Sequence, residues 1–241
     1  MPTEALRIEI AHAGVDEVSA ILDTPEDDPG GPVILLAHGA GAGMESPFMS
    51  TVGQGLAAAG FPTLRFHYAY TERISRGENR RPPDRRPVLQ QVHEVARATL
   101  MERYPERKPV FAGKSMGGRM SSYLAAEGAD CAALVFFGYP LHPAGKPEKL
   151  RSEHFPTLAQ PALFLTGTRD TLCDLELLRP ALETYGGRAS LEIVEDADHD
   201  FGVPRRTGRS RAEVMDELVD RTATWIRATL GLSLASTTEP T

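Results

Sequence analysis

Short apolar runs alternate with segments of helical periodicity along almost the whole chain. An apolar run of about 4–8 residues between turn signals is typical of a buried strand, and amphipathic segments between such runs are typical of covering helices. This alternation predicts an α/β fold with a mostly parallel, twisted sheet of about eight strands and helices on both faces. The predicted strands are 6–10, 18–22, 32–37, 63–66, 110–112, 132–137, 162–166 and 190–194, and the predicted helices are 50–59, 88–103, 116–127, 174–185 and 211–230.

The connections and the end of the chain carry their own signals. We expect a hairpin turn across Ala13-Gly14-Val15-Asp16, between the first two predicted strands. Residues 69–87 and 138–160 are long connections rich in proline, and the second is too short to build a helical lid. We expect one domain over residues 1–232, followed by a small, polar, frayed tail at 233–241.

The strand predicted at 110–112 leads directly into Gly113-Lys114-Ser115-Met116-Gly117. A G-x-S-x-G sequence after a strand is typical of a nucleophile elbow, a sharp turn that exposes a serine hydroxyl above the sheet. The flanking glycines suit that turn because they carry no Cβ atom. An ordinary strand-to-helix turn would also explain the serine, so the assignment of Ser115 as nucleophile depends on its partners.

A serine becomes a good nucleophile only when an oriented base accepts its proton. Asp170 follows the predicted strand 162–166, and His199 follows the predicted strand 190–194. The carboxyl ends of parallel strands meet at one edge of a sheet, so we expect both side chains near Ser115. The pattern therefore predicts a catalytic triad of Ser115, His199 and Asp170, with Asp174 and Asp198 as alternatives for the acid.

A glycine-rich turn, residues 38–43, follows the predicted strand 32–37. Backbone amides in such a turn can stabilise an oxyanion together with the amide after the nucleophile, and we expect Ala40 and Met116 to donate them. Two nucleotide-binding motifs are excluded. Lys108 stands where a P-loop needs its first glycine, and Met44 stands where a dinucleotide fingerprint needs its third. No cofactor is expected.

Composition and charge exclude further classes of protein. The net charge of −7 argues against nonspecific nucleic-acid binding, which needs a basic surface. No stretch approaches the ~18 apolar residues of a membrane span and no secretion signal is recognisable, so we expect a cytoplasmic protein without membrane contact. Cys131 and Cys173 match no zinc or redox spacing, and the acidic residues around His199 lack a second histidine or cysteine. No metal is therefore expected.

With these motifs in this order, the chain resembles the α/β-hydrolase superfamily, and within it the small serine hydrolases related to dienelactone hydrolases. The resemblance covers residues 5 to about 230 and rests on residues 38–43, 113–118, 167–170 and 198–201. It implies the α/β-hydrolase fold without a large lid and cleavage of carboxylic esters of small acyl groups through an acyl-enzyme. Thioesters and activated amides are alternatives. Dienelactone hydrolases carry a cysteine nucleophile, whereas this chain has Ser115.

A subgroup with the same Gly-Lys-Ser-Met-Gly-Gly elbow and a loop rich in arginine and proline is also similar. Some of its relatives are subunits of chromatin-modifying complexes, so a noncatalytic interaction module that keeps the fold is the alternative function. For the enzyme, we expect a small-molecule ester as partner and a monomer or small homo-oligomer.

The residues around the site have less specific signals. Arginines are frequent at 73–86, a segment that is either a solvated loop or a site for anionic groups of a substrate. Lys114 and Arg119 are expected on a solvated helix face or in salt bridges. The elements that end at the catalytic edge supply the candidates for a shallow substrate pocket: Met44, Phe48, Tyr70, Tyr139, His142 and Phe201.

Overall fold

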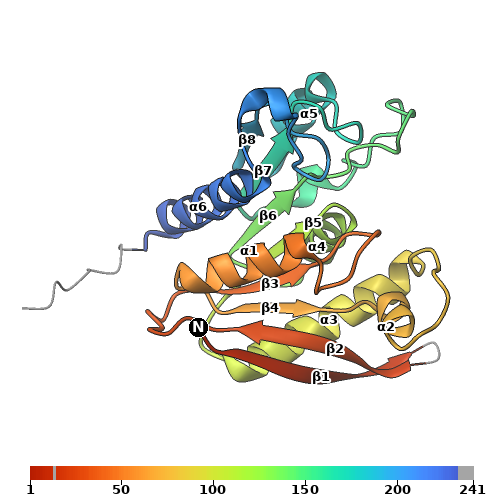
Figure 1. Cartoon of the computed structure of the whole chain (residues 1–241), viewed down its shortest axis with the longest axis vertical. Helices are drawn as coiled ribbons and strands as arrows, with labels where there is room; N and C mark the ends of the chain where they lie inside the picture. Colours follow the sequence, from red (N-terminus) through yellow and green to blue (C-terminus); the bar gives the residue numbers. More distant parts are fainter. Residues whose placement is uncertain (13–14, 233–241) are drawn as a thin grey trace, which may run out of the picture.

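The computed structural model describes residues 1–12 and 15–232. Its strands form one twisted sheet in the order β1-β2-β4-β3-β5-β6-β7-β8 (Figure 1). The pairs β1–β2 and β2–β4 are antiparallel, and all other neighbours are parallel. The prediction of a mostly parallel sheet of about eight strands is confirmed. The strands are β1 (Thr3–His12), β2 (Val15–Asp23), β3 (Val33–Ala37), β4 (Thr63–Phe66), β5 (Pro109–Lys114), β6 (Ala133–Phe137), β7 (Ala162–Gly167) and β8 (Ala189–Val194).

Helices cover both faces of the sheet, as predicted (Figure 1). Buried residues of α1 and α6 pack on one face, and those of α2, α3, α4 and α5 pack on the other. The sequence marks the ends of α6 clearly, because Ser210 and Glu213 form a capping box and Gly231 ends the helix in a left-handed conformation. The helices are α1 (Pro47–Ala58), α2 (Ala69–Ser75), α3 (Arg86–Arg103), α4 (Met116–Ala126), α5 (Leu175–Glu183) and α6 (Arg211–Leu230).

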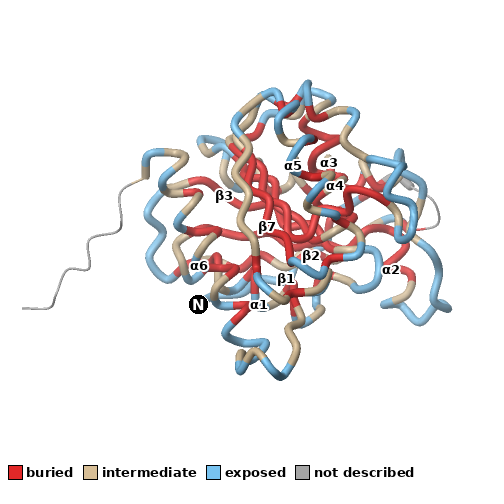
Figure 2. Tube along the Cα trace, turned by 90° about the horizontal axis from the view of Figure 1, so that it is seen from above, coloured by how far each residue is buried: buried red, intermediate tan, exposed pale blue. Residues whose placement is uncertain are grey.

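The central strands are buried on both faces, which explains why they are continuous apolar runs rather than alternating ones. In β3, Ile34 and Leu36 contribute to the core beneath α1 and α6, whereas Val33, Leu35 and Ala37 contribute to the core on the other face. Figure 2 shows this burial as a band through the centre of the molecule, with the exposed residues on the outer loops. The carboxyl ends of these strands are thereby held rigidly at one edge.

Two predictions of local structure are wrong. Residues 69–75, expected in a long loop, form α2. Its helix is held by distant contacts, since buried Glu72 accepts hydrogen bonds from the Ser19 amide and from Arg7. Val15 and Asp16, expected in the hairpin turn, already belong to β2. The other two turn residues, 13–14, and the predicted tail, 233–241, lie outside the described residues.

The connection between β6 and β7 contains a single turn of 3₁₀-helix, Phe155–Thr157, and builds no large lid over the edge. Within residues 1–12 and 15–232, no helix combines the length and the apolar composition that crossing a membrane requires.

A buried ion pair links β2 to β4 and to the segment before α1. Arg65 Nε donates to Asp23 Oδ2 at 2.8 Å, and both side chains are almost fully excluded from solvent. The same guanidinium donates to the Met44 carbonyl at 2.8 Å and to Ser50 Oγ at 3.1 Å. Loss of either partner leaves the other charge buried without compensation, which is costly.

We expect Arg65→Met to lower the free energy of unfolding by about 3–5 kcal/mol, and Asp23→Asn by a similar amount, because each leaves one buried charge unpaired. The double variant should lose clearly less than the sum of the two. Urea unfolding measures all three. Asp130→Asn, which removes an exposed ion pair with Lys108, is the control and should change stability by less than about 1 kcal/mol. Additive losses in the double variant would contradict the expected coupling.

Candidate active site

Ser115 occupies a one-residue turn between β5 and α4. Its backbone has φ 51° and ψ −115°, a conformation that costs free energy for a residue with a Cβ atom. The Ser115 amide donates to the Phe137 carbonyl at 3.0 Å, which ties the turn to β6. The serine side chain therefore stands at the carboxyl edge of the central strands.

The glycines of the motif allow the backbones to meet at this turn. A Cβ atom on Gly117 would lie less than 3.0 Å from the Ala37 carbonyl oxygen, and one on Gly113 would lie less than 3.0 Å from the amide nitrogen of Gly118. Both neighbours are backbone atoms, which cannot move aside as a flexible side chain could. The start of α4 therefore packs directly against the ends of β3 and β5.

The loops after β7 and β8 bring a histidine and a carboxylate to this serine. His199 Nε2 lies 2.8 Å from Ser115 Oγ, and His199 Nδ1 lies 2.9 and 2.8 Å from the two Asp170 oxygens. The Asp170 side chain is 1% exposed and the His199 side chain 20% exposed. With its proton on Nδ1, the imidazole donates to Asp170 and accepts from the serine hydroxyl. The predicted triad residues are thus brought together in hydrogen-bonding order.

The two alternative acids have other hydrogen-bonding partners. Asp174 caps α5 by accepting from the Glu176 amide at 2.9 Å. Asp198 accepts from the amides of Asp200 and Gly202 at 3.0 and 2.8 Å, within its own loop. These contacts explain both aspartates as structural residues, and they favour Asp170 as the partner of the imidazole.

The glycine-rich turn passes beside the serine, and the ring of His38 holds its shape. A Cβ atom on Gly39 would lie 3.6 Å from Ser115 Cβ. His38 Nδ1 donates to the Gly39 carbonyl at 2.7 Å, and Nε2 accepts from the Tyr68 amide at 3.2 Å. Burial lowers the pKa of His38 to about 3, so this histidine stays neutral and keeps both bonds. This role of His38 was not predicted from the sequence.

The two amides predicted to bind an oxyanion belong to residues on either side of the Ser115 turn, in the glycine-rich turn and at the start of α4. Met116 is the first residue of α4, so its amide has no acceptor within the helix. Ala40 is exposed in the turn beside Ser115, and the Tyr70 hydroxyl donates to the Ala40 carbonyl at 3.1 Å. The oxyanion role of both amides remains a prediction.

The six side chains predicted to line a pocket are all buried. Phe48 stacks on Phe201 with 6.0 Å between ring centroids. Tyr139 lies in an aromatic cluster with Phe136 and donates its hydroxyl hydrogen to the Arg151 carbonyl at 2.8 Å. The other three form hydrogen bonds. The Tyr70 hydroxyl donates to the Ala40 carbonyl, His142 Nε2 accepts from the Asp174 amide, and the Met44 carbonyl accepts from Arg65. Their side chains are thus engaged in contacts within the protein, and their contact with a substrate remains a prediction.

Lys114 is not on a solvated helix face, because it ends β5 and is buried, but the expected salt bridge is present, with Nζ 3.5 Å from Asp200 Oδ1. Its ammonium donates to the His199 carbonyl at 2.7 Å, and the side chain is 8% exposed. This bond was not predicted, although the position of Lys114 next to the proposed nucleophile and at the end of a buried strand is a signal that could indicate it.

Most arginines of segment 73–86 are paired with carboxylates of the protein itself. Arg76 binds Glu72 and Glu17, Arg81 binds Glu78, and Arg86 binds Glu127 and stacks over the Tyr123 ring at 3.6 Å. Arg73 lies 3.8 Å from Asp84. This pairing weakens the positive field expected from the segment and reduces its capacity to recognise an anion.

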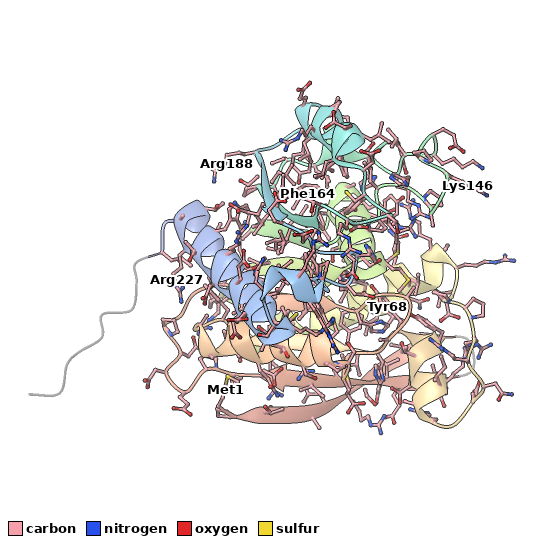
Figure 3. All side chains as sticks on the ribbon, turned by 45° about the horizontal axis from the view of Figure 1, so that its top comes forward. Met1, Tyr68, Lys146, Phe164, Arg188 and Arg227 are labelled. Carbon is pink, nitrogen blue, oxygen red and sulfur yellow. The ribbon has the colours of Figure 1, made fainter. Side chains whose placement is uncertain are left out.

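A surface groove lies at the opposite edge of the sheet. It is lined by residues that precede β3 and β4, including Gly31 and Phe61, and by the end of α6. Met1 and Arg227, which also line it, lie on the side of the molecule away from Tyr68 (Figure 3). The groove is therefore separate from the edge that carries Ser115.

Known proteins share this fold. Residues 30–227 match the family model described as an alpha/beta hydrolase domain. Among solved structures, the dienelactone hydrolase from Anabaena variabilis has a TM-score of 0.73 at 21% identity, covering 94% of this chain and 97% of its own.

Two other solved structures are similar over almost their full lengths. The esterase domain of a Rhodothermus marinus protein gives a TM-score of 0.70 at 16% identity, over 95% of this chain and 99% of that domain. A serine hydrolase without a lid from Xanthomonas campestris gives a TM-score of 0.63 at 18% identity. This match covers 95% of this chain and 94% of that protein. At these identities the likeness shows the fold alone.

We expect Gly117→Ala to lower the free energy of unfolding by about 3 kcal/mol or more, because the added methyl group would overlap the Ala37 carbonyl. Gly41→Ala is the control, since a Cβ atom there meets nothing within 4 Å. Thermal and urea unfolding measure both variants. Equal stability of the two would show that the turn relaxes and that close backbone contact does not require Gly117.

Proposed function

This chain belongs to the α/β-hydrolase family, and we propose that it is a serine hydrolase that cleaves carboxylic esters of small acyl groups. The observation that carries the proposal is the continuous chain of hydrogen bonds from Asp170 through His199 to Ser115, with heavy-atom distances of 2.8–2.9 Å. Such distances allow proton transfer without prior rearrangement.

In the acylation step, Ser115 Oγ attacks the carbonyl carbon of the ester while its proton passes to His199 Nε2. Asp170 holds the imidazole in the required tautomer and stabilises the imidazolium that forms. The negative charge of the tetrahedral intermediate develops on the carbonyl oxygen, where the amides of Ala40 and Met116 would donate to it. The imidazolium returns its proton to the leaving alcohol as the ester C–O bond breaks.

Deacylation repeats these steps with water as the nucleophile. His199 Nε2 accepts a proton from water as the water oxygen attacks the acyl carbon, and the same proton then returns to Ser115 Oγ as the acid leaves. The chain ends the cycle with Ser115 and His199 in their starting protonation states. The steps need only these side chains, two backbone amides and water.

The proposed substrates have short acyl groups. The β6–β7 connection contains one 3₁₀ turn and forms no helical cap around a long acyl chain. The dienelactone hydrolase, the esterase domain and the hydrolase without a lid to which this chain is similar support ester hydrolysis as the reaction. Thioesters are a second substrate class with the same carbonyl chemistry, since the same triad and amides would serve them.

The strained serine backbone favours catalysis over the interaction-module alternative. Positive φ at Ser115 carries a cost of about 1–3 kcal/mol, and the hydroxyl of this residue lies 2.8 Å from His199 Nε2. A module that only binds a partner through its surface would gain nothing from this strain or from the His199–Asp170 pair beside it.

Ser115→Ala tests the function directly. We expect kcat for p-nitrophenyl acetate to fall by about 10⁴-fold or more, since the acyl-enzyme cannot form. Wild-type protein should also react with a fluorophosphonate probe, with the adduct found on Ser115 by mass spectrometry, whereas the variant should not react. Ser121→Ala on the same helix is the control. Turnover by Ser115→Ala at the wild-type rate would remove Ser115 from the mechanism.

The choice of acid is tested by a matched pair of variants. Asp170→Asn should lower kcat by about 10⁴-fold, because the amide no longer stabilises the imidazolium. Asp174→Asn should lower it by less than about threefold, because Asp174 caps α5 and asparagine is also a good cap. Steady-state kinetics with one ester compares the two. The reverse order of effects would make Asp174 the acid.

A further inference from the structure

Lys114 places a buried cation next to the proposed nucleophile. It is the last residue of β5, and its side chain is 8% exposed. Lysine ammonium groups are rarely buried to this extent, because removing the charge from water is costly. This burial lowers the pKa of Lys114, while nearby Asp200, Asp170 and Asp198 act in the opposite direction. A buried ammonium group is stable only when a hydrogen-bonding partner offsets its loss of hydration.

The partner is the backbone of His199. Lys114 Nζ donates to the His199 carbonyl at 2.7 Å, whereas the nearest Asp200 oxygen is 3.5 Å away. The Asp200 side chain is 78% exposed, so water screens its attraction for the ammonium. The hydrogen bond to the His199 carbonyl is therefore shorter than the ion pair with Asp200 and less screened by water.

Packing against neighbouring residues fixes the direction of the Lys114 side chain. The stacked rings of Phe48 and Phe201 each have their centroid 5.9 Å from Nζ, within range of a cation–π interaction. A Cβ atom on Gly39 would lie 3.6 Å from Lys114 Cγ, so the aliphatic stem borders the glycine-rich turn. The ammonium thus reaches His199 from a rigid strand through a restrained side chain.

The loop that carries His199 is strained and is tied to its surroundings, for example by the Asp196 amide, which donates to Thr168 Oγ1 at 2.8 Å. Asp196 and Phe201, on either side of His199, both have φ 59°, a conformation that is unfavourable for residues other than glycine. The Asp198 carboxylate stabilises the loop internally through the amides of Asp200 and Gly202. Lys114 supplies an external contact at the residue whose side chain has to meet Ser115.

We propose that Lys114 is a positioning residue, which holds the backbone of His199 so that the imidazole stays within hydrogen-bonding distance of Ser115. The inference rests on the proposed serine hydrolase function. A displacement of about 1 Å in a reacting group can cost about 10²-fold in rate. Because Lys114 acts through His199, its loss should change kcat and leave KM almost unchanged.

The test compares Lys114→Met, Lys114→Arg and the control Lys108→Met with wild-type protein. Methionine keeps much of the stem but has no donor, and arginine keeps both charge and donors. Lys108 precedes the same strand at its other end and forms an exposed ion pair with Asp130. kcat and KM for p-nitrophenyl acetate, the rate of fluorophosphonate labelling and the melting temperature are measured for each.

We expect Lys114→Met to lower kcat and the labelling rate by about 10²-fold, with KM within about twofold of wild type. Lys114→Arg should retain more of kcat than Lys114→Met, and Lys108→Met should match wild type. Should Lys114→Met fail to fold, Lys114→Leu, which also has no donor, replaces it with the same expected result.

A folded Lys114→Met or Lys114→Leu variant with kcat within about threefold of wild type would overturn the positioning role. The positioning role would also be overturned if the variant had a raised KM and an unchanged kcat. In both cases an active wild-type protein leaves the hydrolase function intact. Wild-type protein that neither hydrolyses esters nor labels at Ser115 would instead overturn the proposed function, and this inference with it.

Discussion

The close approach of backbones where α4 begins is the constraint on which the rest of the site depends. Strand β5 reaches α4 through one residue, and the first turn of the helix packs against the carbonyl at the end of β3. Ser115 has to adopt positive φ to make this connection. The positions of the glycine-rich turn beside it and of the loops after β7 and β8 follow from the parallel order of β3, β5, β6, β7 and β8.

Much of this architecture could be predicted from the sequence. Strand β4 and helix α6 have the predicted bounds; Ser210 with Glu213 and Gly231 mark the two ends of α6 locally. The meeting of Ser115, Asp170 and His199 could be predicted because each follows a parallel strand, and such strands end at a common edge. Here local signals and topology agree.

The contacts that the sequence did not predict are long-range and involve charged groups. Helix α2 depends on Glu72, whose partners Arg7 and Ser19 lie on β1 and β2. Lys114 bonds a main-chain carbonyl 85 residues further along the chain, and any residue type would present that carbonyl. Segment 73–86 has several arginines, but which carboxylate each one meets depends on the folded arrangement. The sequence shows how many charged residues the segment has, but not which residues they contact.

The separation of the two sheet edges has a practical consequence. Met1, Gly231 and Leu232 line the groove at the amino edge, whereas Ser115 stands at the carboxyl edge. A surface tether, affinity handle or fluorescent label joined at residue 1 would therefore project from the side remote from the serine. Immobilised protein attached in this way would keep the edge that carries Ser115 facing the solution.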